Sequence, residues 1–423
     1  MALRAYTVPM LPSTVQATYA QRIAFVCEIA ARLHRYGTTA QRLEAAILAL
    51  SSQLGLDCEP WSNPTGLILS FNDPAKPLGA SDTTRVIRLA PGETDLYKLS
   101  EADRIAEQVA AGQMSIAQGH TSLRALDRLD SRRSHVVRVL AYGLAAASVA
   151  GLWRLPWLDI GTAGVIGLLI GMLTQRSEGR PNLREAGDAI AAMVAGLVAI
   201  GVASLVGPLN LNTVIISSLV VLLPGMTLTN AINELTNQQW VSGTARFAGA
   251  IATVIKLTVG SMIAVTLADL VGIEPAIRAA RPQSEWVEWI AILCAAYAFA
   301  VLFKAGRRDY PWVMAAAAAG YLISRFGGLA WGAPVGLFLS ALTMTACGNL
   351  FARVANRPGA IIRVPGIIML VPGSASLRGL MNLVQGAGGA ADESAGLVVM
   401  KILMALIAGL MFGNLVVASR KNL

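Results

Sequence analysis

The side chains best suited to bind a small polar solute follow a pattern that the chain contains twice: an apolar run, a Pro-Gly pair and a short polar stretch. The first pair, Pro224-Gly225, ends the apolar run 220–223. The polar residues behind it are Thr227, Thr229, Asn230, Asn233 and Glu234. Proline lacks an N–H and clashes with the preceding turn, so we expect a helix to break there. The free N–H groups and positive dipole of the next helix would suit a carboxylate.

The second pair, Pro372-Gly373, repeats this pattern after the apolar run 369–371. Its polar followers are Ser374, Ser376 and Arg378. Serine and threonine often cap helices, which is the simpler explanation for either copy alone. Capping does not explain two copies, and paired interrupted segments are typical of transporter binding sites. We therefore predict that the residues behind both pairs bind substrate.

Three ionisable residues are candidates for coupling transport to protons. Lys256 lies about thirteen residues from either end of its apolar segment, roughly 20 Å at the helix rise. An ionisable group at that depth is a functional hypothesis by default, and an ion pair with Asp188 is the structural alternative. Asp188 or Glu234 would accept the proton, and Lys256 would tune the carboxylate.

The composition is that of a polytopic membrane protein. The chain of 423 residues is 55% hydrophobic and 14% charged, with a mean hydropathy of +0.57. The net charge of +9 comes from arginines between apolar segments, where they set topology, so we expect no nucleic-acid partner. The four cysteines have no paired spacing, and we expect no disulfide framework, metal or cofactor. Residues 1–135 have ordinary charge density and no signal peptide pattern.

Ten apolar segments are expected to cross the membrane. They are 136–155, 157–175, 187–207, 210–224, 244–269, 286–304, 310–325, 328–350, 359–372 and 396–418. The fourth and ninth are short, and each ends at a Pro-Gly pair. The bias of Arg and Lys in the connecting loops favours both termini in the cytoplasm.

The ten segments divide into five and five at the polar stretch 270–285. Because each half has an odd number of spans, the second half has the opposite orientation in the membrane. We therefore expect two inverted five-helix repeats around a central site. The predicted units are 1–135, a cytoplasmic α/β domain; 136–270, the first repeat; and 286–418, the second. The fold class is therefore a mainly α membrane protein preceded by a small α/β domain.

The first 135 residues predict a small domain without catalytic motifs. Amphipathic helices are expected at 16–35 and 38–54, strands at 66–71 and 84–89, a helix capped by Ser100, and a last helix at 114–131. His34, His120 and His135 are isolated, and surface or core roles are expected for them. We find no nucleophile elbow, P-loop or metal spacing, and we do not expect an enzyme.

Small residues in the apolar segments favour close helix packing. Gly161, Gly164, Gly167 and Gly171 form a ridge on the second segment, which predicts packing rather than a dinucleotide loop. Thr343, Thr345, Asn349, Ser217 and Ser218 are weaker binding candidates. Hydrogen bonding to a neighbouring helix is the favoured role for them.

Three motifs carry a resemblance to a known family. They are residues 33–44 (LHRYGTTAQRLE) with 54–56, residues 223–230 with Ser242-Gly243 and Arg246, and residues 370–374. In combination they resemble the bacterial threonine/serine exporter family over nearly the whole chain. The resemblance implies a cytoplasmic N-terminal domain, ten spans, and efflux of threonine and serine across the inner membrane driven by protons. In related two-chain systems the scaffold has been linked to dicarboxylate export.

The leading hypothesis is thus a secondary transporter that exports small hydroxy amino acids by proton antiport. Its partners would be an amino acid, protons and the bilayer, and the sequence allows a homo-oligomer. A dicarboxylate exporter on the same scaffold is the first alternative. A membrane-anchored hydrolase and an uncoupled channel are two more.

Overall fold

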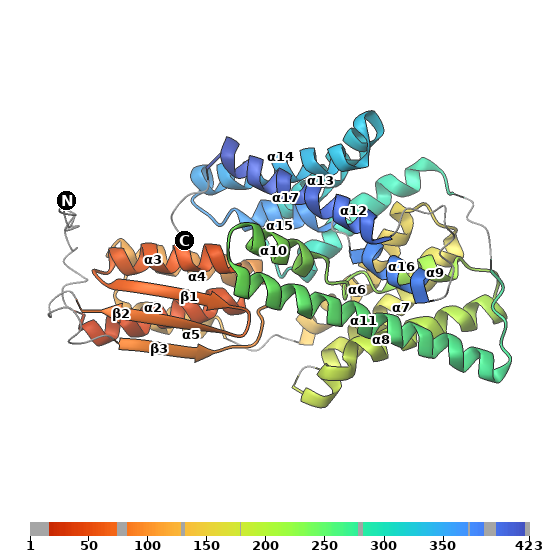
Figure 1. Ribbon diagram of the computed structural model, residues 1–423, viewed down its shortest axis with the longest axis horizontal. Helices are drawn as coiled ribbons and strands as arrows, with labels where there is room; N and C mark the ends of the chain where they lie inside the picture. The colour runs from red at the N-terminus through yellow and green to blue at the C-terminus, as the bar shows by residue number, and fades with distance from the viewer. Residues whose placement is uncertain are drawn as a thin grey trace.

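The computed structural model describes residues 17–73, 83–127, 132–177, 179–277, 282–370, 373–384 and 395–418. These residues form a small α/β domain at one end of the molecule and a bundle of long helices at the other (Figure 1). We call residues 19–125 the N-terminal domain and the helices from residue 132 onward the helical bundle.

The N-terminal domain packs helices against one antiparallel sheet. Its helices are α2 (Tyr19–Arg35), α3 (Ala40–Gln53), α4 (Leu96–Ala110) and α5 (Ile116–Ala125), and its strands are β1 (Asp57–Asn63), β2 (Gly66–Asn72) and β3 (Thr83–Arg88). The strand order is β1-β2-β3, with Cys58 opposite Phe71 and Leu67 opposite Ile87. The apolar faces of α2 and α3 and alternate residues of β2 form the core, in which Phe25, Leu43 and Phe71 are fully buried.

Two predictions for this domain were wrong in detail. Strand β1 was not expected, because its sequence DCEPWSN is polar and contains a proline, which edge strands tolerate. Ser100 does not cap a helix. Helix α4 begins at Leu96, and the side chain of Asp95 caps it by accepting a hydrogen bond from Lys98 N at 2.9 Å. Ser115 caps α5 in a capping box.

The helical bundle contains the apolar segments. Its helices are α6 (Arg132–Leu152), α7 (Trp157–Ser177), α8 (Pro181–Leu205), α9 (Leu211–Ser218), α10 (Gly225–Thr236), α11 (Trp240–Val271), α12 (Glu285–Leu302), α13 (Tyr310–Trp331), α14 (Ala333–Ala355), α15 (Ala360–Ile368), α16 (Gly373–Val384) and α17 (Ala395–Val416). Within the described residues, nine segments are long and apolar enough to cross a membrane. The fourth expected span, 210–224, is missing from that set, because its helix α9 has only eight residues and ends at Ser218.

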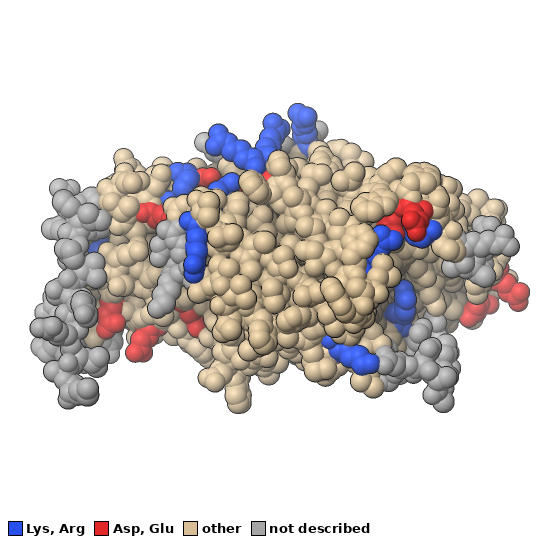
Figure 2. Space-filling view, turned by 90° about the horizontal axis from the view of Figure 1, so that it is seen from above, with Lys and Arg blue, Asp and Glu red and all other residues tan. Residues whose placement is uncertain are grey.

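The surface of the bundle is apolar where lipid would lie. Large side chains such as Leu293 and Val259 are exposed, at 62% and 45%. On the face shown in Figure 2, a central band carries no charged side chains, whereas basic ones project from the upper edge above it and charged ones flank it on both sides. A band of this kind is expected where acyl chains replace water.

The order of helices recurs along the bundle. Three long helices, an interrupted pair and a final long helix run from α6 to α11, and the same series runs from α12 to α17. The third and last helices of each series touch through glycine. A Cβ at Gly260 would meet Ala189 of α8, and a Cβ at Gly409 would meet Ala341 of α14.

The predicted glycine ridge packs as expected. A Cβ at Gly164, Gly167 or Gly171 would lie 3.3 Å or less from Ala147, Ala146 or Tyr142 of α6. Gly161 faces open space. The ridge therefore brings α6 and α7 close together, as small residues do between membrane helices.

Candidate functional site

The two predicted helix breaks pack against each other in the middle of the bundle. Helix α9 ends at Ser218 and α10 begins at Gly225, with Pro224 as its N-cap. A Cβ built at Gly373 would lie 2.9 Å from Leu223 Cβ and 3.3 Å from Gly225 N. Gly373, at the start of α16, therefore touches the first break. Pro372 lies outside the described residues.

The four short helices of the two interrupted pairs lie on two different sides of this contact. Helices α10 and α15 lie on the side of the N-terminal domain, and α9 and α16 lie together farther from it (Figure 1). The polar residues that follow the two breaks are therefore on different sides of the contact. This arrangement decides which predicted residues can share one site.

A cavity of about 270 Å³ lies between the N-terminal domain, α10 and the start of α15. Its walls come from the α2–α3 turn, α3, α4, α10, the end of α14, residues 357–364 and α17. The polar lining residues include Thr38, Gln41, Arg42, Asp103, Glu107, Thr229, Asn230, Asn233, Asn349, Asn356, Arg357, Arg363 and Asn414.

Three of the predicted binding residues line this cavity: Thr229, Asn230 and Asn233. Thr229 Oγ1 donates to Gly225 O at 3.1 Å, within its own helix. Thr227 is not among the lining residues. The cavity therefore brings together most of the polar residues behind the first break.

The predicted residues behind the second break lie elsewhere. Ser374, Ser376 and Arg378 are on α16, and none of them lines the cavity. The Arg378 guanidinium is 5.5 Å from the ring centroid of Trp153, at the end of α6 farthest from the N-terminal domain. The structure thus does not place the two polar clusters in one pocket.

Three of the five weaker candidates bond within the bundle, whereas the buried Thr345 Oγ1 has no hydrogen-bond partner among the described residues. Asn349 donates to Asn414 Oδ1 at 2.9 Å and to Val417 O at 2.7 Å, which confirms hydrogen bonding to a neighbouring helix. Ser217 and Ser218 instead donate to carbonyls of their own helix, Val214 O and Ile215 O. Hydroxyls in apolar surroundings need such partners.

Sequence reasoning missed the basic residues of the cavity. Arg42, on the first turn of α3, makes no hydrogen bond or ion pair with any residue in the described ranges. Burial lowers the pKa of its guanidinium to about 10, which still leaves it charged at neutral pH. Arg363, on α15, also lines the cavity. The only signal for Arg42 was its place in the motif 33–44.

Acidic residues of α4, Asp103 and Glu107, also line the cavity. Asp103 is 4% exposed, and Glu107 accepts a hydrogen bond from Asn356 Nδ2 at 3.1 Å. Arg357 is held by Asp309, to which its Nη2 donates at 2.7 Å. The cavity therefore carries charges of both signs. Within the described parts of the chain, no group of three His, Cys, Asp or Glu residues is placed to hold a metal ion.

Glu234, predicted to couple protons, joins the two parts of the molecule. It is fully buried, and its carboxylate accepts from Ser242 Oγ at 2.7 Å and from Ala40 N at 3.0 Å. Arg246 Nε lies 3.0 Å from the same carboxylate. Because Thr39 provides no side-chain cap, Glu234 is the acceptor at the N-terminus of α3.

Lys256 and Asp188 form the ion pair that was the structural alternative. Lys256 Nζ lies 3.9 Å from Asp188 Oδ2 and donates to Glu185 O at 3.1 Å. The Lys256 side chain is 42% exposed on the protein surface. Neither residue lines the cavity.

Loops of the bundle hold the N-terminal domain in place. The backbone N–H groups of Leu96 and Tyr97 donate to Phe303 O and Lys304 O, at 2.9 and 3.1 Å. Lys304 Nζ lies 4.0 Å from Asp95 Oδ2. Gln239, in the loop after α10, donates to Glu44 Oε2 at 2.7 Å, and Asn356, after α14, donates to Glu107. The loops that follow α10, α12 and α14 therefore all contact this domain.

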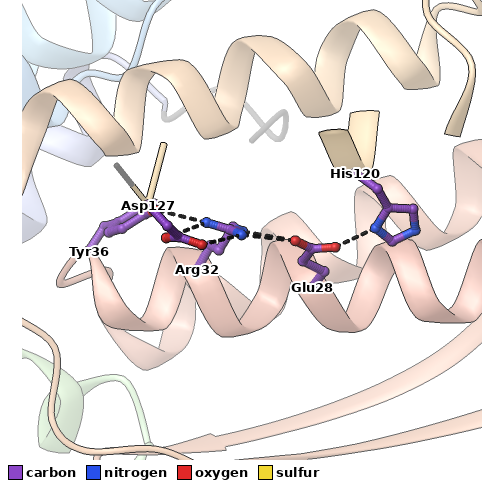
Figure 3. A network of polar contacts seen from close by, with 5 residues as sticks. All are labelled: Glu28, Arg32, Tyr36, His120 and Asp127. Atoms are coloured by element: carbon purple, nitrogen blue, oxygen red, sulfur yellow. Dashed lines mark hydrogen bonds and ion pairs between the residues drawn. The ribbon is translucent and has the colours of Figure 1, made fainter. Parts of the chain in front are cut away.

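A polar network stiffens the wall of the cavity from within the N-terminal domain. Arg32 donates to Glu28 and Asp127, each at 2.9 Å from Nη2, and its Nη1 lies 3.3 Å from Tyr36 Oη (Figure 3). Glu28 in turn contacts His120 of α5. Because Tyr36 lines the cavity, this network fixes the α2–α3 turn at its edge.

Two family models match the chain. The first, ThrE, describes a threonine/serine exporter and matches residues 24–268. The second, ThrE_2 ("Threonine/Serine exporter, ThrE"), matches residues 288–416. The boundary between them falls near the predicted division of the bundle. No solved structure matches the chain.

Curated relatives are yeast proteins named pheromone-regulated membrane protein 10. The chain is 24% identical to that of Zygosaccharomyces rouxii over 87% of its own length and 38% of the relative. It is 24% identical to that of Eremothecium gossypii over 87% and 50%, and 25% identical to that of Pichia sorbitophila over 87% and 38%. The chain thus spans half or less of the length of these relatives.

Proposed function

Because this chain belongs to the threonine/serine exporter family, we propose that it is a secondary transporter that exports threonine and serine. The proton gradient drives the export by antiport. The protein is a multi-pass membrane protein, and the family is one of transporters rather than enzymes. We place it in the inner membrane of a bacterium, with both termini in the cytoplasm.

The cavity beside α10 is the observation that carries the proposal. Its volume of about 270 Å³ lies just below the usual range of small-molecule pockets, so it suits a small solute. Amide side chains of Asn230 and Asn233 offer donors and acceptors for a hydroxyl group. The cavity also carries charges of both signs, as recognition of a zwitterion requires.

The recurring helix order supports alternating access. We propose that α6–α11 and α12–α17 are inverted repeats, so that the ten spans move as two related halves. The contact of Gly373 with Leu223 and Gly225 joins the two interrupted helices at the point about which such halves would rock. With the N-terminal domain inside, the cavity beside α10 is the inward-facing half of the path. Ser374, Ser376 and Arg378 then form the outward half.

Asp188, Glu234 and Lys256 remain the proposed coupling groups. Asp188 and Lys256 form an intramembrane ion pair. Protonation of the Asp188 carboxylate would break this pair and free Lys256. Glu234 lies beside Arg246 at the junction with the N-terminal domain. Its protonation would weaken that junction.

A dicarboxylate exporter is the second candidate, and the arginines of the cavity favour it. Arg42, Arg357 and Arg363 could meet two carboxylates, although Arg357 is engaged by Asp309. Asp103 and Glu107 oppose a second carboxylate because like charges repel.

Counterflow in proteoliposomes tests the proposal. Vesicles that contain the purified full chain are loaded with unlabelled serine and diluted into labelled serine, with threonine, alanine, succinate and malate as competitors. We expect transient accumulation of labelled serine that threonine suppresses and succinate does not. Suppression by succinate alone would favour the dicarboxylate exporter. Uphill movement under an imposed pH gradient excludes an uncoupled channel.

A further inference from the structure

We propose that the N-terminal domain supplies part of the substrate site. Arg42 of α3, with Arg363 of α15, binds the substrate carboxylate, and Asp103 and Glu107 of α4 bind its ammonium group. The ligand class is a zwitterionic α-amino acid. This inference rests on the proposed transport function and assigns to the soluble domain a direct role in recognition.

Arg42 carries the inference because of its surroundings. It is half-buried on a cavity wall, and within the described ranges nothing neutralises it. Glu234, the carboxylate that caps the N-terminus of α3, is already engaged by Arg246, Ser242 and Ala40 N. A guanidinium withdrawn from water without a partner is costly, whereas a carboxylate ligand would satisfy it with two parallel hydrogen bonds.

A second unsatisfied group lies on the same wall. Thr38 Oγ1 is buried and has no hydrogen-bond partner among the residues that the structure describes. Thr38 lines the cavity together with Arg42, four residues along. Buried hydroxyls are nearly always paired, so this one points to a ligand that completes the site.

The carboxylates of α4 define the other end of the ligand. Asp103 and Glu107 are one helical turn apart, so both project from the same face of α4. Both line the cavity that Arg42 lines from α3. A solute with separated positive and negative ends fits these walls better than one with two negative ends.

One consequence is that substrate binding is linked to docking of the N-terminal domain on the helical bundle. The cavity exists only while the N-terminal domain contacts α10 and residues 357–364, so a ligand that binds both sides favours the docked state. The domain thus both recognises the solute and covers the inward side of its path.

The test compares the full-length variants Arg42→Gln, Arg42→Lys and Asp103→Asn/Glu107→Gln in serine counterflow. Arg88→Gln is the matched control, because Arg88 is exposed on β3 and away from the cavity. We expect Arg42→Gln to raise the KM for serine at least about tenfold, the loss typical of a charge-assisted hydrogen bond. Arg42→Lys should be intermediate, and Arg88→Gln should match the wild type.

The acidic pair gives an independent result. We expect Asp103→Asn/Glu107→Gln to weaken competition by serine and to leave or improve competition by succinate. A second measurement does not depend on transport: the increase in thermal stability that serine gives each purified variant in detergent. An unchanged serine KM and unchanged stabilisation in Arg42→Gln would overturn the inference while the transport function stands. Failure of wild-type protein to exchange any amino acid would overturn both.

Discussion

Glu234 Oε1 accepts a hydrogen bond from the backbone N–H of Ala40 at 3.0 Å. The bond links α10, the helix behind the first break, to the first residue of α3 in the N-terminal domain. Arg246 and Ser242 complete the pairing of this fully buried carboxylate. One side chain therefore ties the soluble domain to the helix that lines the cavity.

Removing this charge should loosen the domain junction. We expect Glu234→Gln to leave Arg246 buried without its partner, at a cost of about 3 kcal/mol in the free energy of local opening. Amide hydrogen exchange at the N-terminus of α3 should then accelerate about a hundredfold. Glu274→Gln, in the exposed segment after α11, is the control and should leave this exchange rate unchanged. Equal protection in Glu234→Gln and wild type would mean that other contacts hold the domain.

The contact between the two breaks predicts a sensitive glycine. We expect Gly373→Val to abolish most transport while the protein still inserts, because the new side chain would press against Leu223 and Gly225. A displacement of about 1 Å at a working site can reduce its rate roughly a hundredfold. Counterflow and membrane yield are the measurements. Gly161→Val, where a side chain meets open space, is the control. Normal transport by Gly373→Val would show that the breaks need not touch.

Much of the architecture follows from local patterns. The Pro-Gly pair at 224–225 marked the start of α10, where Pro224 is the N-cap, but not the end of α9, which already stops at Ser218. The ridge of Gly164, Gly167 and Gly171 marked the packing of α6 against α7. Strand β1 was not predicted, because Pro60 and its polar neighbours do not show the alternation of apolar and polar residues that is typical of a strand. Asp95 was not predicted as the N-cap of α4, because Ser100 also fits a capping pattern.

The site was predicted only in the part that is local in sequence. Thr229, Asn230 and Asn233 follow the break directly, so one motif identified them. Arg42 and Arg363 lie far from them in the chain and look like ordinary basic residues of a helix or loop. Only the docking of the N-terminal domain brings them to one cavity, and no periodicity in the sequence encodes that docking.

The ion pair in the membrane gives a test of coupling. We expect Lys256→Ala to abolish transport while leaving insertion intact, because Asp188 would lose the cation 3.9 Å away. The double variant Asp188→Asn/Lys256→Ala separates a coupling role from a structural one. If the pair couples protons, the double variant stays inactive for uphill export. Recovery of uphill export in the double variant would make the pair structural.

The stability of the N-terminal domain should fall in mild acid. Burial lowers the pKa of His34, and the positive charge of Arg246 lowers it further. The contact of His34 Nε2 with Asn63 O, at 3.0 Å, acts in the opposite direction and only partly offsets this. The folded chain then holds His34 neutral at a pH where the unfolded chain binds a proton. Stability is therefore complete above the unfolded pKa of about 6.5 and declines as the pH falls below it. The decline is at most about 1.4 kcal/mol for each pH unit that separates the unfolded from the folded pKa of His34.

Thermal unfolding of the full chain at pH 7.5 and pH 5.5 measures this effect. His34→Gln removes the titrating group, so its midpoint should change less between the two pH values than that of the wild type. A variant with the full wild-type pH dependence would assign the effect to other groups.

The location of the solute can be measured most directly by substrate protection. Cys27, Cys58, Cys294 and Cys347 are replaced by serine, Asn233→Cys is introduced, and a membrane-permeant thiol reagent is applied to vesicles that show counterflow. We predict that serine slows the labelling of residue 233 in proportion to its occupancy, while succinate has little effect. Labelling at the same rate with and without saturating serine, in vesicles that still exchange serine, would contradict a binding site in this cavity.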